Sequence, residues 1–111
     1  MIKGVVITPL DLIDTPGGMV MHAMKETSLG YAGFGEAYFS QVNHGAIKAW
    51  KRHKQMTLNL VVPVGEIKFV LFDDRTDSPT FGKLQEIFLS PENYFLVTVP
   101  PSVSYTHLTL P

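Results

Sequence analysis

The stretch that decides the fold covers residues 45–66 and reads GAIKAWKRHKQMTLNLVVPVGE. In its second half, apolar side chains recur at every second position from Met56 onward, which is the period of a β-strand. The PVGE segment that follows supplies a proline and a glycine, both of which favour a tight turn. The first half, from Ala46, has the length and composition of another strand. The stretch therefore predicts two short strands and a hairpin rather than a helix.

Short apolar segments of the same kind recur along the rest of the chain. They are rich in Val, Ile, Phe and Tyr and are separated by turn-forming stretches such as DTPGG, NHG, DDRTDSPTFG and SPEN. Helical periodicity is nearly absent, so the pattern predicts an all-β domain, either a sandwich or a small barrel. The expected strands are 5–8, 19–25, 35–42, 46–52, 56–62, 67–73, 84–89 and 94–99.

Size, charge and cysteine content exclude several classes of function. A chain of 111 residues with 45% hydrophobic content can form one small domain. A net charge of -1 creates no field that would attract nucleic acid or an anionic membrane, so neither partner is expected. The chain has no cysteine, which excludes disulfides and thiolate metal sites and fits a cytoplasmic location. The longest apolar runs, LNLVVPV and FVLF, are too short to span a bilayer.

The spacing of the deciding stretch resembles the first motif of the cupin superfamily. That motif has glycine, five residues, histidine, one residue, histidine, three or four residues, glutamate, six residues and glycine. Its fixed positions fall on Gly45, Lys51, His53, Leu58 and Gly65. A lysine ammonium and a leucine cannot act as metal ligands, so one imidazole would be left to hold the ion. We therefore expect neither a metal nor another cofactor.

Beyond that motif, the chain resembles the metal-free branch of cupins represented by dTDP-4-dehydrorhamnose 3,5-epimerase. The matching stretches FSQVN, GAIKAWKRH, DDRTDSPTFGK, LSPEN and VPP occur in the family's order. The resemblance implies a cupin-type double-stranded β-helix, or jelly roll, that forms a homodimer. It also implies epimerisation of a nucleotide-linked 4-keto-hexose for polysaccharide biosynthesis. Such a reaction needs a base, an acid and a group that stabilises the enolate.

The resemblance also implies which residues form the site. The histidine that acts as the family's base falls on Lys51, and Lys48 takes the place of an arginine that contacts substrate. Gln41 and Asn43 match polar residues that line the nucleotide site. His53 is the other interior candidate, either as an acid, a base or a hydrogen-bond donor, or as a purely structural histidine.

The lysine at position 51 leaves catalysis and binding open as alternatives. Desolvation lowers the pKa of a buried lysine and can make it a base, but a lysine can also clamp a phosphate or carboxylate. A third possibility is that the side chain extends to the barrel mouth and does no chemistry. The alternative function is therefore a non-catalytic sugar-binding or assembly cupin that has lost its base. A metal-dependent cupin enzyme is disfavoured by Lys51 and Leu58.

Alternation along the strand expected at 46–52 assigns its side chains to two faces. It places Lys51 and His53 on one face and Lys48, Trp50 and Arg52 on the other. We expect Trp50 and Arg52 to pack against the second sheet or a partner subunit, with ligand stacking as the alternative. The DDR triplet farther along the chain is expected to pair locally in a loop rather than to catalyse.

The last ten residues do not follow the resemblance. After VPP the family continues into a glycine and then a strand bearing histidine or tryptophan, whereas this chain reads SVSYTHLTLP. The run from Val103 to Pro111 resembles the translation, in one frame, of a common transposon-based sequencing adapter. We therefore expect a partial cupin domain at 1–101, incomplete at its C-terminal end, and a non-native tail at 102–111 whose side chains have no function.

Overall fold

The computed structural model describes residues 1–109, and the regular structure in this part of the chain consists of β-strands only. The all-β prediction is therefore confirmed. No helix among the described residues is long and apolar enough to cross a membrane. The strands are β1 (Val6–Pro9), β2 (Leu12–Thr15), β3 (Gly18–Met21), β4 (Ile47–Lys51), β5 (Leu58–Leu60), β6 (Ile67–Phe72), β7 (Leu84–Leu89), β8 (Phe95–Val99) and β9 (Ser104–Thr109).

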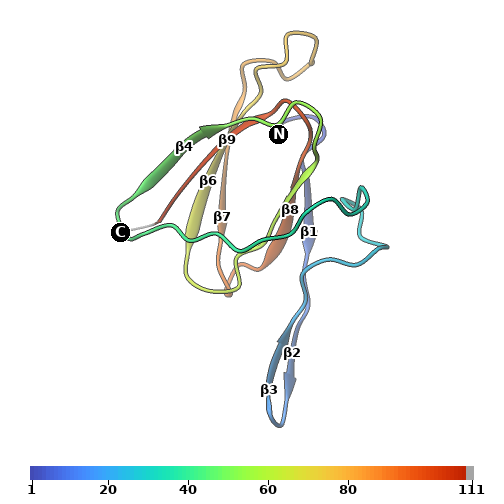
Figure 1. Ribbon diagram of the computed structural model, residues 1–111, viewed down its shortest axis with the longest axis vertical. Coiled ribbons are helices and arrows are strands. Elements are labelled where there is room, and N and C mark those ends of the chain that lie inside the picture. The colour runs from blue at the N-terminus through green and yellow to red at the C-terminus, as the bar shows by residue number, and fades with distance from the viewer. Residues whose placement is uncertain (110–111) are drawn as a thin grey trace.

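Two antiparallel sheets face each other and give the molecule its jelly-roll form (Figure 1). One sheet has the strand order β1-β8-β5, and the other has the order β4-β9-β6-β7. The remaining two strands, β2 and β3, form a hairpin that projects away from both sheets. Strands that are distant in the sequence therefore become neighbours, as in β1 with β8 and β4 with β9.

The hydrophobic core lies between the inner faces of the two sheets. Phe69 and Leu71 on β6 and Val97 and Val99 on β8 are buried, because alternate residues of a strand share one face. Leu58 on β5 packs against the same core. The position at which the cupin motif has a glutamate is therefore an apolar packing position in this chain.

The prediction of a strand at 35–42 is wrong, whereas each of the other predicted segments overlaps an observed strand. The chain between β3 and β4 runs across the molecule without regular structure, and Phe39 in it is 99% exposed. Apolar composition alone suggested a strand there, but a strand also requires a partner for its backbone groups. Near Gly30 the same segment packs closely on Thr98 of β8.

The strands β2 and β9 were not predicted. β9 lies between β4 and β6 and pairs with both, so part of the stretch expected to be a non-native tail supplies a central strand position. A central strand needs only backbone donors and acceptors to complete the ladder. Ser102, just before β9, has a φ of 69°, a left-handed conformation that glycine adopts more readily.

Candidate functional site

A β-bulge in β4 determines which side chains face the barrel interior. Lys48 lies opposite His107 of β9 and Lys51 lies opposite Tyr105, so β4 advances by one residue more than its partner. Directly opposed residues project from the same face of a sheet, and His107 and Tyr105 share a face because they are two positions apart. Lys48 and Lys51 therefore also share that face. The prediction that they point in opposite directions is wrong, because simple alternation does not anticipate the extra residue.

Lys48 and Lys51 both place positive charge near His107. The pKa of His107 is lowered first by burial and then by the charges of Lys48 and Lys51. The Lys48 Nζ atom donates a hydrogen bond to Ser40 Oγ at 3.1 Å, which fixes its ammonium group. Lys51 is exposed at the end of β4. The structure thus brings together two lysines that alternation had separated.

His53 lies just after β4 and turns toward the same inner face. Its Nε2 atom is 3.1 Å from the Tyr105 hydroxyl, and the two rings lie 5.9 Å apart. The backbone amide of Ser102 donates to the His53 carbonyl at 2.7 Å, which holds this irregular segment in place. The pKa of Tyr105 is raised, first by burial and then by nearby Tyr38.

Gln41 and Asn43 lie in the irregular segment before β4, and both are exposed. The Asn43 carbonyl accepts a hydrogen bond from the Ala46 amide at 2.8 Å in the turn that leads into β4. The sequence analysis did not single out Ser40, which belongs to the same segment and contacts Lys48. Its position in the matching stretch FSQVN was the signal that could have identified it.

Trp50 and Arg52 project from the outer face, as alternation predicted. The Trp50 ring meets the Phe72 ring of β6 edge to face, with centroids 6.4 Å apart. Arg52 Nη1 donates to Asp74 Oδ2 at 3.0 Å. Both contacts lie on the outer face of their own sheet, so Trp50 does not pack against the second sheet.

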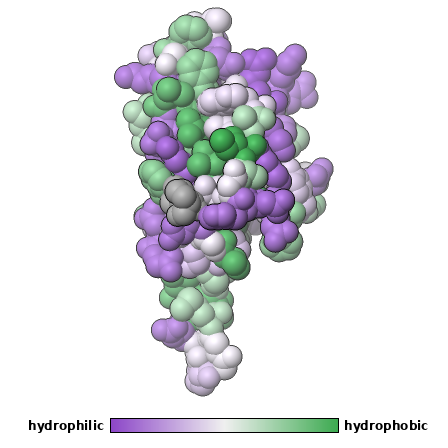
Figure 2. Space-filling view, turned by 90° about the vertical axis from the view of Figure 1, so that its left-hand side faces the viewer, coloured by the Kyte–Doolittle hydropathy of each residue, from purple (hydrophilic) through white to green (hydrophobic). Residues whose placement is uncertain are grey.

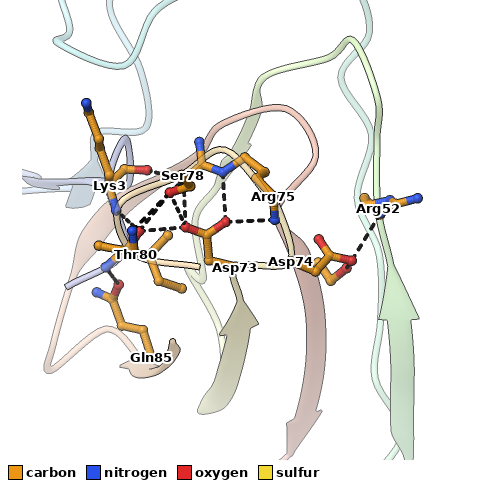
Figure 3. A network of polar contacts seen from close by, with 10 residues as sticks. Lys3, Arg52, Asp73, Asp74, Arg75, Ser78, Thr80 and Gln85 are labelled. Carbon is orange, nitrogen blue, oxygen red and sulfur yellow. Dashed lines mark hydrogen bonds and ion pairs between the residues drawn. The ribbon is translucent and has the colours of Figure 1, made fainter. Parts of the chain in front are cut away.

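A buried carboxylate network lies at the end of β6, beside the Arg52–Asp74 pair (Figure 3). Asp73 is 0% exposed and accepts hydrogen bonds from Arg75, Ser78 and Thr80. The Arg75 guanidinium also donates to the Lys3 carbonyl at 2.6 Å. The prediction of local pairing for the DDR triplet is confirmed, and the network joins the N-terminal segment to the loop after β6.

The arrangement as a whole can bind an anion and transfer a proton. Two ammonium groups on one face can hold a phosphate, a carboxylate or the charge of an enolate. An imidazole can accept or donate a proton as a general base or acid. Lys48, Lys51 and His53 supply these functions from one strand and the segment that follows it.

Comparison with known proteins finds relatives of the whole chain among dTDP-sugar isomerases and epimerases. No protein-family model matches the chain. A dTDP sugar isomerase from Desulfovibrio desulfuricans G20 is 42% identical, with a TM-score of 0.93 over 97% of this chain and 69% of that one. A dTDP-6-deoxy-D-glucose-3,5-epimerase from Legionella pneumophila Philadelphia 1, solved with dTDP-4-keto-L-rhamnose, is 25% identical, with a TM-score of 0.80 over 96% of this chain and 60% of that one.

Two curated proteins also match. A "probable low-salt glycan biosynthesis epimerase" of Haloferax volcanii is 34% identical over 65 residues, which are 58% of this chain and 42% of that protein. The spore coat polysaccharide biosynthesis protein SpsL of Bacillus subtilis is 27% identical over 110 residues, which are 99% of this chain and 73% of that protein. The chain thus spans less than half the length of the haloarchaeal relative.

Proposed function

Because this chain belongs to the dTDP-sugar epimerase family of cupin-type proteins, we propose that it epimerises a nucleotide-linked 4-keto-hexose in polysaccharide biosynthesis. The reaction would remove a proton from the carbon next to the ketone and return a proton to the opposite face. The two curated relatives, a glycan epimerase and a spore coat polysaccharide protein, support this class of pathway.

One observation carries the proposal, namely the bulge that brings Lys48 and Lys51 to the same face as the residues opposite them on β9. An enolate intermediate develops negative charge on the ketone oxygen. The Lys48 ammonium, and the Lys51 ammonium that forms when the neutral Lys51 amine accepts the substrate proton, lower the free energy of that charge. Lys48, held by Ser40, is suited to bind the charged substrate. We propose that Gln41 and Asn43 contact the nucleotide from the segment before β4.

The base and the acid are assigned to Lys51 and His53. Lys51 takes the position of the histidine base implied by the family resemblance. The His53 imidazole has a ring nitrogen that can carry a proton, and it lies against the inner face. The proposal assigns no role to a metal ion or to another cofactor.

Isotope incorporation tests the proposed reaction directly. The protein is incubated in deuterated water with dTDP-4-keto-6-deoxyglucose, and the carbons next to the ketone are examined by NMR. We expect deuterium at one or both of these carbons. No label above the level in enzyme-free buffer would contradict an epimerase function.

A binding protein without catalytic activity is the second candidate. It is favoured by the exposure of Lys51 at the end of β4, because an exposed lysine can hold an anionic group without taking part in catalysis. This candidate predicts that the nucleotide sugar binds without isotope exchange. Calorimetry alongside the labelling experiment separates the two functions.

We further infer that the protein is a cytosolic homodimer. The β2–β3 hairpin projects from the sheets with Leu12, Ile13, Met19 and Val20 all at least 40% exposed, and such an apolar arm suits contact with a second copy. The side that carries β4 also presents apolar residues among hydrophilic ones (Figure 2). Light scattering after size-exclusion chromatography tests the dimer, and cell fractionation tests the location.

A further inference from the structure

We propose that Trp50 and Arg52 act as an outer-face brace that positions Lys51 and His53 for the proposed reaction. The outer-face brace consists of the contacts that these two side chains make with the end of β6. Trp50 and Arg52 point away from the candidate site and are therefore positioning residues. The inference rests on the proposed function, because that function gives Lys51 and His53 their roles.

The position of β4 in its sheet explains why a brace is needed. Within the described residues, β4 is an edge strand and pairs only with β9. The bulge interrupts this ladder between Lys48 and Lys51, and regular pairing ends at Lys51. Beyond Lys51 the described backbone–backbone contacts of this segment reduce to the bond from the Ser102 amide to the His53 carbonyl, so its side-chain contacts contribute to its orientation.

Two side-chain contacts reach from the end of β4 and the residue after it to the end of β6. The Trp50 ring lies edge to face against Phe72, with planes inclined by 70°. The Arg52 guanidinium pairs with Asp74 at 3.0 Å. Because β9 lies between β4 and β6, both contacts cross the outer face of an intervening strand.

The far end of the brace is itself firmly held. Asp74 follows Asp73, which is fully buried and held by the Arg75 guanidinium and two hydroxyl groups (Figure 3). The Asp73 backbone is fixed as well, since its amide donates to the Lys83 carbonyl at 3.0 Å and its carbonyl accepts from the Gly82 amide at 2.7 Å. Arg52 is thus tethered to a rigid loop.

The two residues of the outer-face brace alternate in the sequence with the two proposed reacting residues. Trp50 and Arg52 face outward, whereas Lys51 and His53 face inward. A rotation of this segment that moved the inner side chains would also have to break the outer contacts. Fixing the outer side chains therefore restricts the inner ones, and misplacement of a reacting group by about 1 Å can lower a rate roughly hundredfold.

The Arg52–Asp74 pair can be tested separately from global stability. Its side chains are 44% and 29% exposed, and pairs with this exposure contribute little to the free energy of unfolding. The chain also offers a matched control, the Lys68–Glu86 pair on the outer face of the same sheet, at 3.1 Å. Removal of that control pair leaves β4 untouched.

The experiment compares Arg52→Ala with Lys68→Ala in the complete chain. In the deuterium-exchange assay we expect Arg52→Ala to lower kcat by roughly tenfold to hundredfold, with KM changed less than about threefold. Lys68→Ala should leave both constants unchanged. Exchanging the charges, with Arg52→Asp and Asp74→Arg together, should recover much of the lost kcat. A kcat for Arg52→Ala equal to that of Lys68→Ala would overturn the brace.

A second readout does not depend on activity. The His53 ring signals are followed by proton–carbon NMR in the unmodified protein and in both variants. If the unmodified protein shows no exchange, the proposed function fails, but the brace still predicts a shift of the His53 signals in Arg52→Ala and no shift in Lys68→Ala. Unmoved His53 signals in Arg52→Ala would overturn the brace on their own.

Discussion

At the scale of single residues, Lys51 decides whether the protein epimerises the nucleotide sugar or only binds it. As the proposed base it accepts the proton from the carbon next to the ketone, and loss of a general base typically lowers a rate about 10²- to 10⁴-fold. We therefore expect Lys51→Ala to lower the exchange rate by at least about a hundredfold. The change should leave the fold intact because the side chain is exposed. NMR label incorporation and circular dichroism measure the two effects.

Two further variants make the Lys51 result specific. Lys51→His introduces the residue that the family resemblance implies at this position, and we expect it to retain or increase the exchange rate. Lys54→Ala removes a neighbouring exposed lysine and should have no effect. If Lys51→Ala exchanged label as fast as Lys54→Ala, the base would have to be another group, and His53 would be the next to change.

Asp73 determines how the fold responds to acid. Arg75 is the main cause that holds the pKa of Asp73 well below its usual value, with smaller contributions from Ser78 and Thr80. A depressed folded-state pKa adds stability above the unfolded pKa of about 4, and this stability is lost as the pH falls further. Asp73→Asn should therefore destabilise the protein at pH 7, by about 3 kcal/mol as for a broken buried pair.

The difference between Asp73→Asn and the unmodified protein should shrink progressively below about pH 4. Urea unfolding at pH 7, 5 and 3 measures this convergence. Asp77→Asn serves as a control, because Asp77 is a nearby exposed aspartate outside the hydrogen-bond network. A constant difference across the pH range would show that Asp73 acts through packing rather than through its charge.

At the scale of elements, the irregular segment between β3 and β4 depends on one close backbone approach. A Cβ atom on Gly30 would lie 1.8 Å from Thr98 Oγ1. Thr98 cannot easily move, because its hydroxyl donates to Asn59 Oδ1 at 2.6 Å and the Asn59 amide donates to the Gly30 carbonyl at 3.1 Å. We expect Gly30→Ala to lower the free energy of unfolding by about 1–3 kcal/mol, as overpacking does.

Gly35→Ala provides the matched comparison in the same segment. No atom lies within 4 Å of the Cβ position at Gly35, and its φ is not in the left-handed region. This variant should be neutral or slightly stabilising. Equal melting temperatures for Gly30→Ala and Gly35→Ala would contradict the close packing of this segment on β8.

The same elements show what the sequence could and could not predict. Short apolar segments bounded by turn-forming residues located β6, β7 and β8 well, because buried strands require apolar side chains and end where turn residues begin. The bulge in β4 could not be predicted, since it depends on the register with a strand more than fifty residues away. Lys48 was therefore selected by resemblance but assigned to the wrong face, whereas Lys51 and the outward Trp50 were placed correctly.

At the scale of the whole molecule, the sandwich depends on β9, which lies within the stretch predicted to be a non-native tail. β9 joins β4 to β6, and so it connects the candidate site to the rest of the four-stranded sheet. Backbone pairing tolerates many sequences at such a position, whereas the turn that leads into it is less tolerant. We propose that 102–111 is a non-native tail at a position where the native chain continues into a different strand.

Ser102 provides a test of that proposal in the protein itself. Its φ of 69° costs a residue with a side chain roughly 1 kcal/mol relative to glycine. We expect Ser102→Gly to raise the free energy of unfolding by about 0.5–1 kcal/mol. The relief of the left-handed conformation stabilises the folded state, and the greater entropy of glycine in the unfolded state offsets part of this gain. Ser104→Gly, within β9, should have the opposite sign because glycine weakens a strand interior. Urea titration of both variants measures the difference.

A long sequencing read across the codons for 99–111 addresses the same proposal at its source. If the tail is foreign, the native frame should diverge at or just after VPP, with a glycine codon at position 102, where the backbone is left-handed. A native chain with glycine there would reach the β9 position without strain, and its own side chains would then face Lys48 and Lys51 across the ladder. A read that reproduced SVSYTHLTLP in genomic context would reject the foreign tail, and it would make Tyr105, the partner of His53, a native member of the candidate site.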